Sequence, residues 1–184
     1  GCVGGRERRG GVAGAGRGSR RRRQSAPAKL VVGIKMATTP GKVIFQNGLM
    51  QLMQYTPTTE NVLRTPLLIV PPWINKFYIL DLKPENSFIK WAIEAGYTVF
   101  VISWVNPDKD LTKLVFEDYM KLGPLSALDA IEKATGEKKV SAIGYCIGGT
   151  LMATTLAYMA ARGDDRIAAW PIFTAQVVFT EPGE

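Results

Sequence analysis

The chain has 184 residues, 46% of them hydrophobic and 21% charged, a composition that is ordinary for one globular domain with its own hydrophobic core. Its formal net charge of +7 lies in residues 1–28, where eight basic residues stand against one acidic residue, so the rest of the chain is neutral. The composition therefore argues against a folded surface with a net positive field, and no apolar run reaches the ~18–20 residues that a membrane-spanning helix needs.

Residues 1–28 are rich in Gly, Arg and Ala and contain almost no large apolar side chain. Such a segment buries too little surface to offset its ordering entropy, so we predict a disordered tail. Its run of four arginines, residues 20–23, could contact nucleic acid or anionic lipid, but no interleaved aromatic residues are available to stack on bases. A solvated tail or an out-of-frame translation is the favoured interpretation. The segment lacks the apolar core of an export signal, and because the sequence begins with Gly1, we expect the true start to lie elsewhere.

The first elements after the tail are strands. Lys42–Gln46 and Leu49–Tyr55 are short strand-like runs, and Asn47-Gly48 between them is a strong hairpin signal. Leu67–Val70 is an apolar run that ends at two prolines, which is typical of a buried strand.

Helices and strands then alternate. Glu85–Ala95 has helical periodicity and ends before Gly96, and Thr98–Trp104 has the composition of a buried strand. The next stretch, Leu114–Thr135, is predicted to be helical, with a break at Gly123-Pro124.

Three further elements follow: a core strand at Lys139–Gly144, a tightly packed helix at Gly148–Arg162 and a strand at Ala168–Val178, in which Pro171 is awkward. This alternation predicts a mostly parallel sheet with helices on both faces and with Leu67–Val70, Thr98–Trp104 and Lys139–Gly144 at its centre. Functional residues of such sheets lie at the carboxyl ends of the strands.

The segment Gly144-Tyr145-Cys146-Ile147-Gly148-Gly149 follows a predicted strand and opens a predicted helix. That context is required for a nucleophile elbow, the sharp strand-to-helix turn that presents a catalytic side chain. Side chains larger than glycine two positions to either side of Cys146 would collide, and the N–H of Ile147 would be free to donate to an oxyanion. The alternative is a cysteine that only packs where a glycine-rich strand meets a helix; the context favours the nucleophile.

A cysteine nucleophile forms a thioester whose activation is close to that of a coenzyme A thioester, so it favours acyl transfer over hydrolysis. It also needs a base and a group that orients the base. The sequence contains no histidine, so we expect the triad Asp and His to lie outside it. The two cysteines, Cys2 and Cys146, do not look like a disulfide framework and favour a reducing compartment.

These residues, together with several longer stretches, resemble the polyhydroxyalkanoate synthases, most closely those acting on short-chain 3-hydroxyacyl-CoA. The resemblance runs from about Gly33 to Phe179 and departs from the family in the tail before Lys29, at Trp73, where a small residue or Cys is expected, and at Trp170-Pro171. The stretches that carry it are residues 39–47, 50–55, 66–82, 84–88, 103–108 and 144–150.

The resemblance implies an α/β-hydrolase fold, in which residues 29–184 form the N-terminal part of a catalytic domain that is truncated after the elbow helix and the next strand. It implies that Cys146 carries the acyl chain while (R)-3-hydroxyacyl-CoA is polymerised into polyester and coenzyme A is released. The expected oxyanion donors are the N–H of Ile147 and the N–H of Trp73 or Ile74. Gly144, Gly148 and Gly149 shape the elbow. It further implies no metal or cofactor besides the substrate, a homodimer, and a cytoplasmic location on polyester granules.

Two alternatives remain open at this point. A dienelactone-hydrolase-like enzyme also places Cys in a Gly-Tyr-Cys-x-Gly-Gly elbow, although the long matches at residues 66–82 and 103–108 favour the synthases. A non-catalytic scaffold with a nucleic-acid-binding tail rests on residues 1–28 alone.

Overall fold

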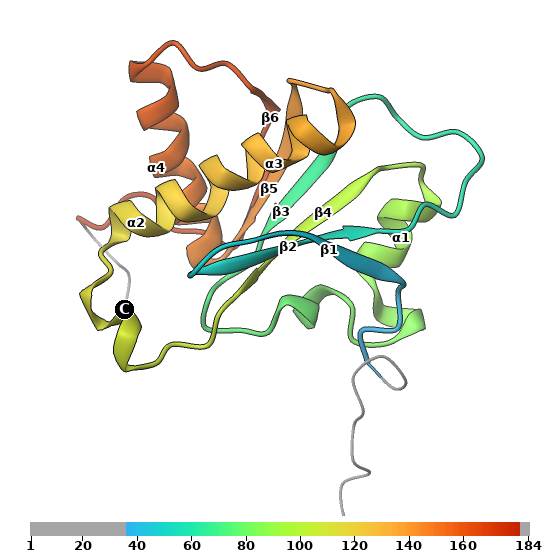
Figure 1. Cartoon of the computed structure of the whole chain (residues 1–184), viewed down its shortest axis with the longest axis horizontal. Helices are drawn as coiled ribbons and strands as arrows, with labels where there is room; N and C mark the ends of the chain where they lie inside the picture. Colours follow the sequence, from blue (N-terminus) through green and yellow to red (C-terminus); the bar gives the residue numbers. More distant parts are fainter. Residues whose placement is uncertain (1–35, 181–184) are drawn as a thin grey trace, which may run out of the picture.

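The computed structural model describes residues 36–180, so the predicted disordered tail lies outside the described residues. One seven-stranded sheet has the order β1-β2-β4-β3-β5-β6, and β7 pairs with β5 (Figure 1). The strands β3, β4 and β5 run parallel, whereas β1 and β2 are antiparallel additions at one edge. The strands are β1 (Gly41–Gln46), β2 (Met50–Tyr55), β3 (Leu67–Val70), β4 (Val99–Trp104), β5 (Val140–Tyr145), β6 (Ile167–Ala169) and β7 (Ile172–Phe173).

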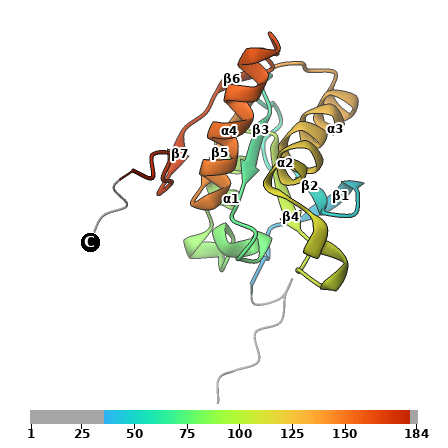
Figure 2. The same cartoon turned by 90° about the vertical axis from the view of Figure 1, so that its left-hand side faces the viewer.

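Helices cover both faces of this sheet, as predicted (Figures 1 and 2). Short 3₁₀ turns occur at η1 (Phe77–Leu80), η2 (Pro84–Asn86) and η3 (Lys109–Lys113), and a π-helical turn, η4 (Lys121–Leu125), joins α2 to α3. The α-helices are α1 (Phe88–Glu94), α2 (Phe116–Met120), α3 (Ser126–Thr135) and α4 (Ile147–Ala161). None of the helices within residues 36–180 combines the length and the apolar character needed to cross a bilayer.

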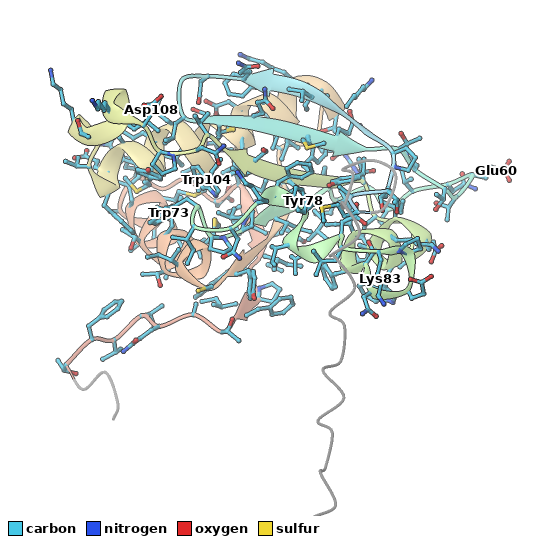
Figure 3. All side chains as sticks on the ribbon, turned by 90° about the horizontal axis from the view of Figure 1, so that it is seen from below. Glu60, Trp73, Tyr78, Lys83, Trp104 and Asp108 are labelled. Carbon is cyan, nitrogen blue, oxygen red and sulfur yellow. The ribbon has the colours of Figure 1, made fainter. Side chains whose placement is uncertain are left out.

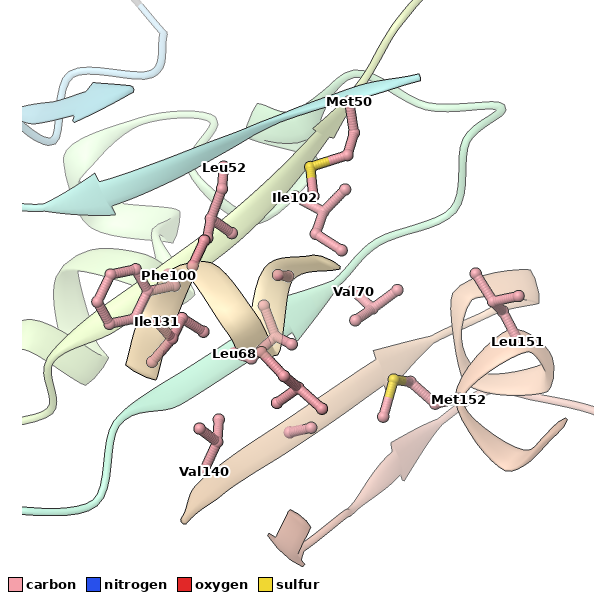
Figure 4. Close-up of a cluster of buried hydrophobic side chains, with 14 of the residues drawn as sticks. Met50, Leu52, Leu68, Val70, Phe100, Ile102, Ile131, Val140, Leu151 and Met152 are labelled. Atoms are coloured by element: carbon pink, nitrogen blue, oxygen red, sulfur yellow. The ribbon is translucent and has the colours of Figure 1, made fainter. Parts of the chain in front are cut away.

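The core has two parts because successive side chains of a strand point to opposite faces. Leu68 and Val70 of β3 face α3 and α4 and join the larger hydrophobic cluster (Figure 4). Leu67 and Ile69 of the same strand face α1 and join the smaller cluster. All four residues of β3 are buried, which confirms the prediction of a central strand that is covered on both sides.

The predicted hairpin is confirmed, and its turn is attached to the helical face. The side chain of Asn47 accepts hydrogen bonds from the N–H groups of Leu49 and Met50, both at 2.9 Å, which closes the turn. Its amide group donates to the carbonyl oxygen of Leu122 at 2.8 Å. The hairpin is therefore fixed to η4, and Leu49, predicted to be in the strand, belongs to the turn instead.

The predicted break at Gly123-Pro124 is a π turn within one continuous helical run. A proline removes one N–H donor from a helix, and the wider π turn accommodates the missing bond. The hydroxyl of Ser126 donates to the carbonyl oxygen of Lys121 at 2.9 Å across this turn. The run ends at Gly136, whose φ of 76° gives the helix a left-handed C-terminal cap.

Helix α1 begins later than predicted because Ser87 caps it. The Ser87 hydroxyl oxygen accepts from the N–H of Lys90 at 2.9 Å and donates to the carboxylate of Asp81 at 2.6 Å. Asp81 is fully buried and also accepts from the hydroxyl of Thr39 at 2.7 Å. One carboxylate thus holds the start of α1 and the entry to β1 together.

The predicted strand at Ala168–Val178 is wrong in its extent. The structure has two short strands, β6 and β7, separated by Trp170 and Pro171, and no regular structure from Thr174 to Thr180. Proline has no N–H for a strand ladder, so the pairing with β5 is interrupted after Ala169 and resumes where the Pro171 carbonyl oxygen accepts from the N–H of Gly144 at 3.2 Å.

Candidate active site

Cys146 occupies the turn between β5 and α4, at the carboxyl end of a central strand. Its φ of 54° and ψ of −128° place it in a region that side chains other than glycine rarely adopt. Its N–H donates to the carbonyl oxygen of Phe173 at 2.8 Å, and its own carbonyl oxygen accepts from the N–H of Gly149 at 2.8 Å. The backbone is thus held from both sides, and the thiol is left half-buried at the turn.

The glycines two positions to either side of Cys146 are required by close backbone contacts. A Cβ atom at Gly144 would lie 2.5 Å from the Cα of Gly149. A Cβ atom at Gly148 would overlap the carbonyl oxygen of Val70 and lie 2.9 Å from that of Pro71. Only glycine fits at these two positions without moving the backbone of β3 or α4, and this close approach is what makes the turn sharp.

Gly149 lies against the segment at the end of the described chain and not against β3. A Cβ atom there would lie 2.5 Å from the Cβ of Ala175 and 2.7 Å from the side chain of Ile172. The hydroxyl of Thr150 donates to the carbonyl oxygen of Gln176 at 2.7 Å. The segment after β7 therefore passes directly over the first turn of α4.

Ile147 is the first residue of α4, a helix of 15 residues. N–H groups in the first turn of a helix have no carbonyl partner within the helix, and the helix dipole adds partial positive charge there. An anion that develops next to Cys146 would be stabilised by these unpaired N–H groups and by the partial positive charge of the helix dipole. This supports the predicted oxyanion donor at Ile147, which stays a prediction.

The loop after β3 reaches the same end of the sheet. Pro72 to Asn75 form a tight turn in which the N–H of Asn75 donates to the carbonyl oxygen of Pro72 at 3.2 Å. Trp73 and Ile74 are its central residues; Trp73 is half-buried and Ile74 is 75% exposed. Among the residues that the structure describes, neither of their N–H groups donates to a backbone carbonyl. Both remain candidates for the second oxyanion donor.

The side chain of Trp73 packs into an aromatic cluster at the carboxyl ends of β3 and β4. Its ring centroid lies 4.7 Å from that of Tyr119, 6.0 Å from that of Trp104 and 6.2 Å from that of Phe116. Figure 3 shows Trp73 and Trp104 next to each other. The large ring, unexpected from the resemblance, is thus supported by α2 and β4.

Trp104 makes a contact that sequence reasoning missed. The sequence predicts it only as the end of a strand, but its indole N–H donates to the carbonyl oxygen of Pro71 at 2.7 Å in a buried position. The two residues are 33 positions apart in the sequence, so no local pattern joins them. The only signal was a tryptophan at the end of a buried strand, because a buried indole N–H needs an acceptor.

Metal binding is not indicated by the part of the chain that the structure describes, in which no three His, Cys, Asp or Glu side chains are grouped to hold an ion.

Sequence comparison identifies relatives along most of the chain. A family described as the N-terminus of poly-beta-hydroxybutyrate polymerase (PhaC) matches residues 13–92, so the match includes part of the tail, where we saw no resemblance. The poly(3-hydroxyalkanoate) polymerase subunit PhaC of Rhizobium meliloti is 58% identical over 92% of this chain and 28% of its own length. The corresponding subunit of Cupriavidus necator is 40% identical over 87% of this chain and 27% of its own length.

Structural comparison supports the fold. A fungal esterase from Rhizomucor miehei superposes with a TM-score of 0.53 at 14% identity, covering 74% of this chain and 44% of the esterase. Together with the sheet order and the elbow, this confirms the predicted α/β-hydrolase fold. The chain spans about a quarter of the length of the curated relatives it matches. Over that span, it belongs to the poly(3-hydroxyalkanoate) polymerase family.

Proposed function

We propose that Cys146 is the nucleophile of an acyltransferase that polymerises (R)-3-hydroxyacyl-CoA into polyhydroxyalkanoate and releases coenzyme A. The observation that carries the proposal is the conformation of Cys146, a strained residue between β5 and α4, flanked by two glycines that leave no room for a Cβ atom. Strain of this kind persists only where the surrounding structure imposes it, and it is concentrated at active sites.

The chemistry follows from the elbow. The Cys146 thiolate attacks the thioester carbonyl, a bond forms between sulfur and carbon, and the carbonyl oxygen becomes an oxyanion. The N–H of Ile147 and an N–H from Trp73 or Ile74 would stabilise that charge. The bond to the sulfur of coenzyme A then breaks, coenzyme A leaves, and the acyl group stays on Cys146 as a thioester. The hydroxyl of a second (R)-3-hydroxyacyl unit then attacks this thioester: an ester bond forms, the bond to the Cys146 sulfur breaks and restores the thiolate, and the hydroxyl proton passes to the base.

The proton of the thiol needs a base, and this sequence has no histidine to serve as one. We propose that an Asp and a His outside these 184 residues complete the triad. Without that base, a single slow acylation of the Cys146 sulfur remains chemically accessible to the chain itself, whereas repeated turnover does not.

The names of the relatives support the proposed substrate and product, since both are called poly(3-hydroxyalkanoate) polymerase subunits. A homodimer and a location on cytoplasmic polyester granules, both implied by the family resemblance, belong to the same proposal. The proposed reaction uses no cofactor, because the coenzyme A thioester is itself the substrate.

The test uses a chimera of the Rhizobium meliloti relative. In this chimera, residues 36–180 of the present chain replace the matching segment of the complete polymerase. Release of coenzyme A from (R)-3-hydroxybutyryl-CoA and formation of polymer are followed together. Cys146→Ala should abolish both, and Cys146→Ser should retain little activity, because a serine hydroxyl is a far poorer nucleophile than a thiolate. Undiminished release from Cys146→Ala would contradict the proposal. Free 3-hydroxybutyrate without polymer would instead indicate a dienelactone-hydrolase-like enzyme.

A further inference from the structure

We propose that Trp104 is a positioning residue for the oxyanion donors: its indole N–H fixes the carbonyl of Pro71 and thereby sets the direction of the N–H groups of Trp73 and Ile74. This inference rests on the proposed function, since it concerns how the same site stabilises a developing oxyanion. It adds a side chain that acts through the backbone of the loop after β3.

The hydrogen bond begins where the strand ladder ends. β3 and β4 pair up to Ile69 and Val101, and beyond that point Pro71 and Pro72 have no N–H groups with which to continue. The indole N–H of Trp104, at 2.7 Å from the oxygen of Pro71, supplies a lateral bond that the backbone lacks. The direction of this carbonyl is therefore set by a side chain from the neighbouring strand.

The same carbonyl lies against the elbow. A Cβ atom at Gly148 would be 2.9 Å from the oxygen of Pro71, so this oxygen lies between the indole and the first turn of α4. The turn that carries the N–H groups of Trp73 and Ile74 starts at the next residue, Pro72. Rotation of the Pro71 carbonyl would turn these N–H groups relative to Ile147.

The indole is itself held from the opposite side. A Cβ atom at Gly123 would lie 2.5 Å from Cη2 of the Trp104 ring, so the π turn η4 provides a socket that only glycine leaves open. The ring of Tyr119 packs at 5.6 Å between centroids, and Trp104 is 9% exposed. A π turn in a helix often marks a functional site, and here it seats the residue that orients the loop.

A role in packing alone would need the shape of the ring but not its N–H. Two variants separate these roles: Trp104→Phe, and replacement of Trp104 by β-(3-benzothienyl)alanine, which keeps the two-ring shape and has no N–H. The control is Trp91→Phe, since Trp91 is 57% exposed on α1, at the other face of the sheet.

The experiment compares two reactions of Cys146 in the 184-residue chain at pH about 9, where an ordinary thiol is mostly ionised. Acylation by (R)-3-hydroxybutyryl-CoA passes through an oxyanion, whereas alkylation by iodoacetamide does not. Both rates are measured by mass spectrometry of the peptide that contains Cys146.

We expect both Trp104 variants to slow acylation by roughly 10- to 100-fold, the range for a displaced or lost oxyanion donor, with alkylation unchanged. Trp91→Phe should leave both rates unchanged. Acylation at the wild-type rate in the benzothienyl variant would overturn the proposal for Trp104 and leave the proposed function intact. Equal slowing of acylation and alkylation would reduce Trp104 to a packing role. Acylation that persists in Cys146→Ala would instead overturn the proposed function.

Discussion

The strand that leads into the elbow and the segment that follows the elbow helix are built from similarly apolar residues but differ in burial and in strand pairing. β5 pairs with β3 on one side and with β6 and β7 on the other, and it is mostly buried. β6 and β7 total five residues at the sheet edge, and Trp170 and Phe173 are exposed at 47% and 38%. A parallel strand is stable where neighbours cover both its edges and its faces, and of these two regions only β5 has this cover. The elbow is therefore built on the end of a strand that is paired along both of its edges.

The largest effect is expected where the elbow touches β3. Gly148→Ala would place a methyl group on the carbonyl oxygen of Val70, and because backbone contacts this close cannot relax locally, we expect a loss of at least ~3 kcal/mol in the free energy of unfolding. Urea denaturation measures the change. The control is Gly48→Ala, at a position where an added Cβ meets nothing within 4 Å. A Gly148→Ala protein as stable as this control would show that the elbow is not as tight as described.

The next effect contrasts the two regions directly. Ile69→Ala would empty a fully buried site in β3 and should cost ~2–5 kcal/mol of unfolding free energy. Phe179→Ala removes a larger side chain that is 62% exposed, and it should change the stability by less than ~0.5 kcal/mol. Thermal unfolding of both variants checks the contrast. Similar losses would mean that the end of the chain is supported as well as its centre.

The smallest effect concerns Tyr55, whose side chain is buried while its hydroxyl has no hydrogen-bond partner among the described residues. Tyr55→Phe removes an unsatisfied polar atom and should leave the free energy of unfolding unchanged or raise it by ~1 kcal/mol. A loss of more than ~1 kcal/mol would indicate a partner such as a buried water.

The same residue predicts a pH dependence. Burial, and to a smaller extent the charge of Asp81, raises the pKa of the Tyr55 phenol well above its ordinary value. The folded state then keeps a proton that the unfolded chain loses near pH ~10, so its stability contribution is present below that pH and falls as the pH rises further. Tyr55→Phe should therefore flatten the alkaline loss of stability by up to ~1.4 kcal/mol per pH unit, as measured by urea unfolding between pH 9 and 11.

The elements that could be predicted from the sequence are those with local signals. Gly144, Cys146 and Gly148 stand where an apolar run meets a helix, and their spacing in this context predicts both the turn and the collisions at the two glycines. The central strands could be predicted equally well, because an apolar run such as Leu67–Val70, with no alternation of polar residues, needs helices on both faces of the sheet to bury it.

The remainder depended on contacts between residues distant in the sequence. The Trp104 indole reaches Pro71 over 33 positions, and Gly123-Pro124 stays helical because η4 widens and packs on that indole. Pro171 indicates from the sequence that the last strand is interrupted. That the chain pairs with β5 both before and after the interruption depends on the pairing of the whole sheet.

The central claim, that Cys146 is an acyl-accepting nucleophile, is tested most directly by mass spectrometry of the 184-residue chain after mixing with (R)-3-hydroxybutyryl-CoA. The account predicts one acyl group on the peptide that contains Cys146, one equivalent of coenzyme A released, no further turnover, and no adduct at that peptide in Cys146→Ala. Peptide mapping separates this adduct from any at Cys2. Sustained release over many turnovers, or release that is unaffected by Cys146→Ala, would contradict the account.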